Sequence, residues 1–129
     1  MSIKIQISPG ELIDKFTILD IKLNRIKAKE KTQNIRKEHK ILKRQIEKNL
    51  PKSKRLSALI SKLKTINKTL WDIEDQIRVC ERKQDFEKKF IKLARSVYQK
   101  NDLRSSYKRE INTLLGSEII EEKSYESYS

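Results

Sequence analysis

Two carboxylates in the stretch LWDIEDQIRVCER (residues 70–82) are the first side chains whose spacing could support chemistry. Asp72 and Asp75 are three residues apart, so a helix would place both on one face, where they could hold Mg²⁺. The same spacing also suits ion pairs, because Arg78 lies three residues after Asp75 and four after Glu74. We favour ion pairs that fix the helix register, and we predict no metal site.

A second group of charged and amide side chains could line a pocket inside a helical bundle. Its members are Arg95, Asn101, Asp102, Arg104 and Lys108, with Glu11, Asp14 and Lys15 expected across from them. Such a pocket would bind a phosphorylated or carboxylated metabolite. However, the carboxylate pattern of helical nucleotide pyrophosphohydrolases and the Arg and Lys spacing of helical chorismate mutases are both missing. A small all-helical enzyme is therefore the second of two hypotheses.

The positive charge of the chain is concentrated in one third of its length. The net charge is +13; residues 22–64 hold 16 Lys and Arg against three acids, whereas the rest carries 15 of each sign. A dense row of cations attracts nucleic acid or another phosphate-bearing partner. The aromatic side chains that favour single-strand binding are missing from this stretch. The residues predicted to contact an anionic partner are Arg36, Lys37, Lys40, Lys43, Arg44, Lys48, Lys52, Lys54 and Arg55.

Capping residues and apolar spacing predict the first helix. Ser8, Pro9 and Glu11 have the spacing of an N-cap, a first helical residue and the third residue of a capping box. Apolar residues then recur at steps of three and four. The helix is expected over about 9–49, either continuous or broken near Thr32, where the pattern fades.

Two further helices and one strand complete the predicted fold. Helices are expected over about 54–82 and 85–115, and alternating isoleucines over 2–7 predict a short N-terminal β-strand. Short connections favour antiparallel neighbours. We therefore predict an all-α protein: a three-helix bundle from which the first two helices project as an antiparallel, coiled-coil-like arm. This arm spans about 27–62 and carries the positive charge.

Length and composition predict one helical domain over 1–116, followed by an acidic and polar tail over 117–129. The one cysteine excludes an intramolecular disulfide and any multi-cysteine zinc site. No apolar run is long enough for a transmembrane segment. No cofactor is expected. The apolar surface left on the arm and the N-terminal isoleucines favours a homodimer.

Four stretches together resemble a family of short bacterial and bacteriophage helical proteins classed as a domain of unknown function. They are ISPGELIDKFTILDIKL (7–23), LWDIEDQIR (70–78), FIKLARSVYQKNDLRSSYKREIN (90–112) and GSEIIEEKSY (116–125). The resemblance covers most of the chain, is weakest over 27–66, and defines no catalytic residue. With it, the expected location is the cytoplasm of a bacterium or of a virus-infected host cell.

These stretches share polar residues as well as apolar seams. Because buried charges are costly unless paired, we expect them to meet at the base of the bundle, with EEKSY (121–125) folded back over the first helix. This charged base cluster, structural or ligand-binding, comprises Glu11, Asp14, Lys15, Asp75, Arg78, Arg95, Asn101, Asp102, Lys123 and Tyr125. The first hypothesis is a non-enzymatic interaction or assembly protein that engages an anionic partner through its basic arm.

Overall fold

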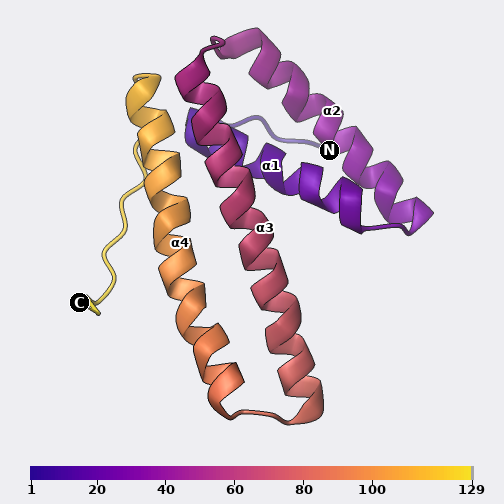
Figure 1. The fold of residues 1–129 in the computed structure, drawn as a ribbon. Coiled ribbons are helices and arrows are strands. Elements are labelled where there is room, and N and C mark those ends of the chain that lie inside the picture. The colour runs from indigo at the N-terminus through magenta and orange to yellow at the C-terminus, as the bar shows by residue number, and fades with distance from the viewer. Residues whose placement is uncertain (129) are drawn as a thin grey trace.

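A computed structural model describes residues 1–128 and shows, within them, an all-α protein of four helices. These are α1 (Pro9–Arg25), α2 (Lys29–Asn49), α3 (Lys54–Lys83) and α4 (Lys88–Leu114). α3 and α4 form a long antiparallel hairpin, and α1 packs against all three other helices (Figure 1). The all-α prediction is confirmed, but the prediction of a three-helix bundle is wrong, because the first predicted helix is two helices.

The chain leaves the helical conformation between Ile26 and Ala28, where ψ is about 123° at both residues, earlier than the predicted break at Thr32. α2 then turns back and packs on α1 (Figure 1). A straight helix of about 40 residues would leave the apolar stripe of α2 in water, whereas folding back covers it. The predicted arm over 27–62 therefore does not project as a helical pair. The part that projects is the far half of the α3–α4 hairpin.

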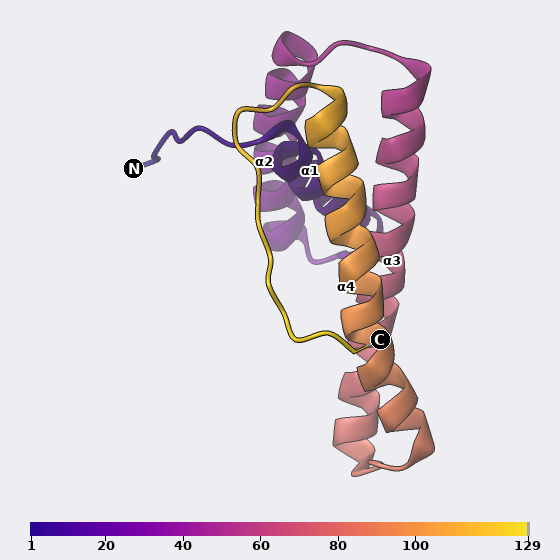
Figure 2. The same ribbon diagram turned by 90° about the vertical axis from the view of Figure 1, so that its left-hand side faces the viewer.

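The predicted N-terminal strand is also absent from the described residues. Ile3 and Ile5 are 79% and 75% exposed, and residues 1–8 contain no strand. Alternating hydrophobicity produces a stable strand only where another strand pairs with it. The described residues offer no such strand, and the N-terminal segment leaves the helices (Figure 2).

The core lies where α1 crosses the upper part of the α3–α4 hairpin. The buried apolar residues of α3 recur at steps of three, four and seven, and α3 packs against α1 and α4. The buried cluster consists of Ile13 from α1, Leu56, Leu59, Leu63 and Ile66 from α3, and Ile111 from α4. This packing fixes one face of α1 against both long helices, and the same face carries Asp14, which bonds Asn67 of α3 and Arg104 of α4.

The end of α3 provides a first test of the structure. Gln84 closes the helix in the left-handed region, at φ +57° and ψ +34°, where L side chains are strained. We expect Gln84→Gly to raise the free energy of unfolding by about 0.5–1 kcal/mol, measured by thermal unfolding. The control is Gln84→Ala, which keeps the strain and loses the 2.8 Å hydrogen bond to the Glu81 carbonyl, and should lower stability. If both variants lowered the stability, the left-handed backbone at Gln84 would not be strained.

Candidate functional site

The basic residues predicted to meet an anionic partner all lie on the surface. Six are on the outer face of α2, one is in the connection to α3, and two are in the first turn of α3. Within residues 1–128, every one is exposed and none takes part in an ion pair: Arg36, Lys37, Lys40, Lys43, Arg44, Lys48, Lys52, Lys54 and Arg55. We call the six on α2 the α2 basic face.

The opposite face of α2 holds the helix on α1. Ile35 is buried against α1, and the His39 ring stacks on Phe16 with ring centroids 4.5 Å apart. His39 Nε2 also lies 2.7 Å from Asp20 Oδ1, and the Lys64 ammonium is 3.6 Å from the other oxygen of the same carboxylate. Because these contacts fix the rotation of α2, its basic face points outward. From Arg36 to Lys48 this face extends about 18 Å.

A second set of charges is buried where α1 meets α3 and α4. The Asp14 side chain is only 2% exposed, and its carboxylate accepts hydrogen bonds from Arg104 at 2.5 and 3.0 Å. Asn67 of α3 donates a further hydrogen bond at 2.9 Å. Burial raises the pKa of Asp14, but the hydrogen bonds from Arg104 and Asn67 and the charges of Arg104 and Lys108 outweigh burial, so the pKa lies below its ordinary range. Asp14 therefore stays ionised at neutral pH.

Lys108 extends this network toward the chain's C-terminal tail. Its ammonium lies 2.8 Å from Glu11, 3.3 Å from Glu121 and 4.0 Å from Asp14. Burial lowers the pKa of Lys108, but the hydrogen bond from Lys108 to Glu11 and the three nearby carboxylates raise it above its ordinary value. A lysine held protonated in this way is neither a nucleophile nor a base. With every cation matched by a carboxylate, this cluster is suited to joining helices.

Four residues of the predicted charged base cluster come together here. Glu11 and Asp14 are central, Lys15 lies 3.8 Å from Glu11, and Lys123 lies 3.6 Å from Glu121. Ser8 caps α1 as predicted, accepting the Glu11 backbone N–H at 3.2 Å. The Glu11 carboxylate, however, bonds Lys108, which gives it an inter-helix role beyond the predicted capping.

The other six residues of that cluster lie elsewhere. Asp75 and Arg95 are exposed, and Arg78 pairs with its helix neighbour Glu74 at 3.3 Å. The remaining three lie along α4 and the tail: Asn101 is half-buried, Asp102 accepts a 2.9 Å hydrogen bond from Tyr128, and Tyr125 is exposed.

The tail runs beside α4 (Figure 2). Its contacts with α4 include the pairs Glu121–Lys108 and Glu122–Arg109, the Tyr128–Asp102 hydrogen bond and the packing of the Tyr128 ring on Tyr98. We expected the tail to cover α1, but these contacts place it along α4.

Several partners in the buried network escaped the sequence reasoning. Asn67 and Asn112 are buried, and Asn112 Oδ1 accepts the Gly10 backbone N–H at 2.7 Å. One sequence pattern could have indicated a polar contact on this side of α1. Gly10, Asp14 and Thr17 follow one another at steps of four and three, which places one glycine and two polar side chains on a single face of the helix. Thr17 accepts a second hydrogen bond from Asn67 at 2.9 Å.

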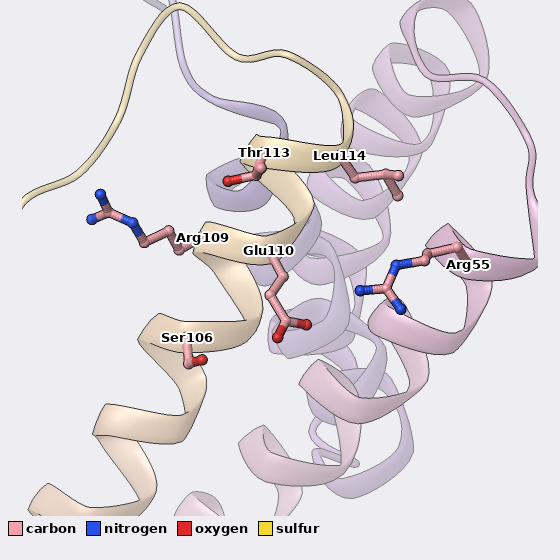
Figure 3. Close-up of a pocket in the computed structure, with 6 residues that line it drawn as sticks. All are labelled: Arg55, Ser106, Arg109, Glu110, Thr113 and Leu114. Atoms are coloured by element: carbon pink, nitrogen blue, oxygen red, sulfur yellow. The ribbon is translucent and has the colours of Figure 1, made fainter.

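An open hollow of about 420 Å³ lies between the start of α3 and the end of α4. It is lined by Arg55, Ser106, Arg109, Glu110, Thr113 and Leu114. Figure 3 shows the side chains of Glu110 and Arg55 directed into the space between α4 and α3, whereas the Arg109 side chain points to the other side of α4. Small-molecule sites are usually enclosed and have several polar groups that converge on the ligand. This open hollow has neither property.

Residues 1–128 contain neither a metal-binding cluster nor a membrane-spanning helix. No cluster of three or more His, Cys, Asp or Glu side chains is placed to hold a metal ion. None of the helices combines the length and the apolar character needed to cross a membrane.

Comparison with known proteins places the chain in a family. No curated protein and no solved structure matches it. The model of a family of unknown function (DUF6165) matches residues 3–128, which is almost the whole chain. The resemblance to a domain of unknown function is thereby confirmed, and the chain belongs to the DUF6165 family.

Proposed function

We propose that this protein is a cytoplasmic, non-enzymatic binding protein whose α2 basic face engages the phosphate backbone of duplex nucleic acid. The observation that carries the proposal is the set of six exposed cations on one helix face, with no carboxylate of residues 1–128 paired to any of them. Cations left without an internal partner can exchange their counterions for phosphates, and this release drives nucleic-acid binding.

The chemistry of the face favours a duplex over a single strand. Residues 22–64 contain no Phe, Tyr or Trp on which a free base could stack. Lysine predominates, and lysine contacts phosphate as a point charge without reading base edges. We therefore propose binding without sequence preference.

The alternative enzyme hypothesis has less support. It needs reactive groups at the charged base, yet Asp14, Arg104 and Lys108 are joined to one another or to Glu11. Such paired charges hold helices together and leave no group free to transfer a proton.

The homodimer remains a proposal with narrower support. The sequence suggested a dimer because two apolar surfaces looked uncovered. One of them, the apolar stripe of α2, is covered by α1. The exposed Ile3 and Ile5 remain as the other. Sedimentation equilibrium of the full chain would give the oligomeric state directly.

The test is fluorescence anisotropy with a labelled DNA duplex at about 50 and 200 mM salt. Six phosphate contacts should weaken binding about 10³-fold across this range. The variant Lys40→Glu/Arg44→Glu/Lys48→Glu should weaken binding more than about 100-fold at the lower salt, because it reverses half of the face. These three positions are four residues apart and exposed, so the helix should persist.

A matched control separates the α2 face from total charge. Lys62→Glu/Lys68→Glu/Lys92→Glu makes the same change in net charge at exposed positions of α3 and α4. Equal losses in both variants, or no binding at the lower salt, would contradict the proposed interface. The protein could instead bind vesicles of anionic lipid and not the duplex, and lose that binding when the α2 basic face is reversed. That result would show that the partner of the α2 basic face is a phosphorylated surface and not nucleic acid.

A further inference from the structure

The far end of the α3–α4 hairpin is the most projecting part of the molecule. α3 has 30 residues and is therefore about 45 Å long, and its last turns extend with α4 beyond α1 and α2 (Figure 1). We define the hairpin tip as residues 78–95, which include the end of α3, the connection and the first turns of α4. The tip lies at the opposite end of α3 from the connection to α2.

The hairpin tip exposes large apolar side chains. Phe86 is 45% exposed and Ile91 is 54% exposed. Phe90 packs edge-on against Phe86, with ring centroids 5.3 Å apart and an interplanar angle of 87°. One exposed apolar residue is ordinary, but two large exposed ones together with the half-buried Phe90 form a local apolar surface at a projecting end.

Exposed cations lie close in sequence to this apolar surface. The tip holds seven Lys and Arg against three acids, so it is basic in its own right. The charge of the chain outside 22–64 sums to zero because net negative charge over 1–21, 65–77 and 117–129 offsets the net positive charge over 78–116. Of the seven, Arg78 is paired with Glu74, whereas the other six are exposed without an ion pair in the described part of the chain: Arg82, Lys83, Lys88, Lys89, Lys92 and Arg95.

We propose that the hairpin tip docks on the surface of an anionic lipid bilayer. Phe86 and Ile91 enter the boundary between headgroups and acyl chains, while the surrounding lysines contact lipid phosphates. Apolar burial together with electrostatic attraction is the combination that holds peripheral proteins on anionic membranes, and each Lys or Arg near such a surface adds to the affinity. Lysine stems can also lie along the apolar boundary with the ammonium groups in the headgroup layer.

The same residues favour lipid over a nucleic-acid strand. Single-strand binding depends on aromatic faces, on which bases stack. The most exposed apolar residue of the tip is the aliphatic Ile91, and Phe90 already occupies one side of Phe86. Acyl chains accept aliphatic and aromatic side chains alike. A convex, projecting end also meets a flat bilayer without obstruction from α1 or α2.

The test is co-sedimentation of the full chain with two kinds of vesicle, phosphatidylcholine alone and phosphatidylcholine mixed with phosphatidylglycerol. We expect binding to the anionic vesicles and little to the neutral ones. Phe86→Ser and Ile91→Ser should each weaken that binding at least about threefold, because each removes buried apolar area. Lys88→Glu/Lys89→Glu should weaken it more than about tenfold. Circular dichroism checks the fold of each variant, and Ile91→Ser changes a side chain with little packing to lose.

A fluorescence experiment reports insertion itself. In a Trp71→Phe background, Phe86→Trp places the only tryptophan at the tip, and anionic vesicles should shift its emission to shorter wavelength. An unshifted emission would overturn the proposal, as would full binding of the Ser variants. If Lys40→Glu/Arg44→Glu/Lys48→Glu abolished vesicle binding and the tip reversal Lys88→Glu/Lys89→Glu did not, the membrane-binding surface would be α2 and not the hairpin tip. Loss of duplex or single-strand binding on tip reversal, with vesicle binding intact, would assign the tip to nucleic acid.

Discussion

Replacing Asp14 by alanine is expected to lower the free energy of unfolding by about 3–5 kcal/mol, a large share of the stability of a domain of this size. The carboxylate is 2% exposed and bonds Arg104 and Asn67 directly. Its removal leaves the Arg104 guanidinium partly buried without its main partner and removes one of the neighbours of Lys108. An uncompensated buried charge costs more than the pair itself contributes. Urea unfolding followed by circular dichroism measures the change.

Lowering the pH should produce part of the same effect in the unaltered protein. The pKa of Asp14 is held below its ordinary value of 3.8 in the folded state, so unfolding raises it. Protons therefore bind the unfolded state more readily, and stability falls as the pH falls. The contribution of Asp14 is complete above the unfolded pKa and is lost as the pH drops through the folded one. The slope of stability against pH below about pH 5 should be shallower in Asp14→Ala.

Two variants separate the charge of Asp14 from its place in the fold. Asp14→Asn keeps the volume and an acceptor but removes the charge, and we expect a loss only somewhat smaller than that of alanine. Asp75→Ala, on an exposed carboxylate, should change stability by less than about 0.5 kcal/mol. Equal effects at positions 14 and 75 would show that the buried network does not stabilise the fold.

Local patterns predicted the helices better than they predicted how the helices meet. Apolar residues recur at steps of three and four from Leu56 to Cys80, which is the pattern of one continuous helix, and both of these residues are buried in α3. The break at Ile26–Ala28 has no glycine or proline to mark it. It arises because α2 is covered by folding onto α1, which is a tertiary effect that no short window contains.

The candidate sites likewise depend on both local sequence and helix packing, and the sequence predicts only the first of these. The sequence does allow the inference that acids of α1 face Arg104 and Lys108 of α4. The two segments carry opposite charges at helical spacing, and such charges are expected to pair. Asp75 and Arg95 are also charged residues in helical segments, but both are exposed, and the ion pair that the end of α1 makes with this part of α3 is Arg25–Asp72. Which charges are buried depends on where α1 crosses the hairpin, and sequence spacing does not give that crossing point.

Gly10 marks that crossing point, and replacing it by alanine is expected to lower the free energy of unfolding by about 2 kcal/mol. A Cβ at this position would stand 2.5 Å from the backbone oxygen of Lys108 and 2.9 Å from Asn112 Oδ1. Real Cβ atoms do not approach backbone oxygen so closely, and the oxygen belongs to α4 and cannot turn aside. The start of α1 must therefore move away from α4, which weakens the 2.7 Å hydrogen bond from Gly10 to Asn112.

The sign of the change decides between two physical effects. Helix propensity alone favours alanine over glycine by about 1 kcal/mol, so a Gly10→Ala variant of an open α1 would be more stable. Close contact with α4 predicts the opposite sign. It also predicts that Gly10→Ala and Glu11→Gln together cost less than the sum of the two, because displacement of α1 already weakens the 2.8 Å pair between Glu11 and Lys108. Stabilisation by Gly10→Ala, or strict additivity with Glu11→Gln, would show that the start of α1 is not held against α4 in solution.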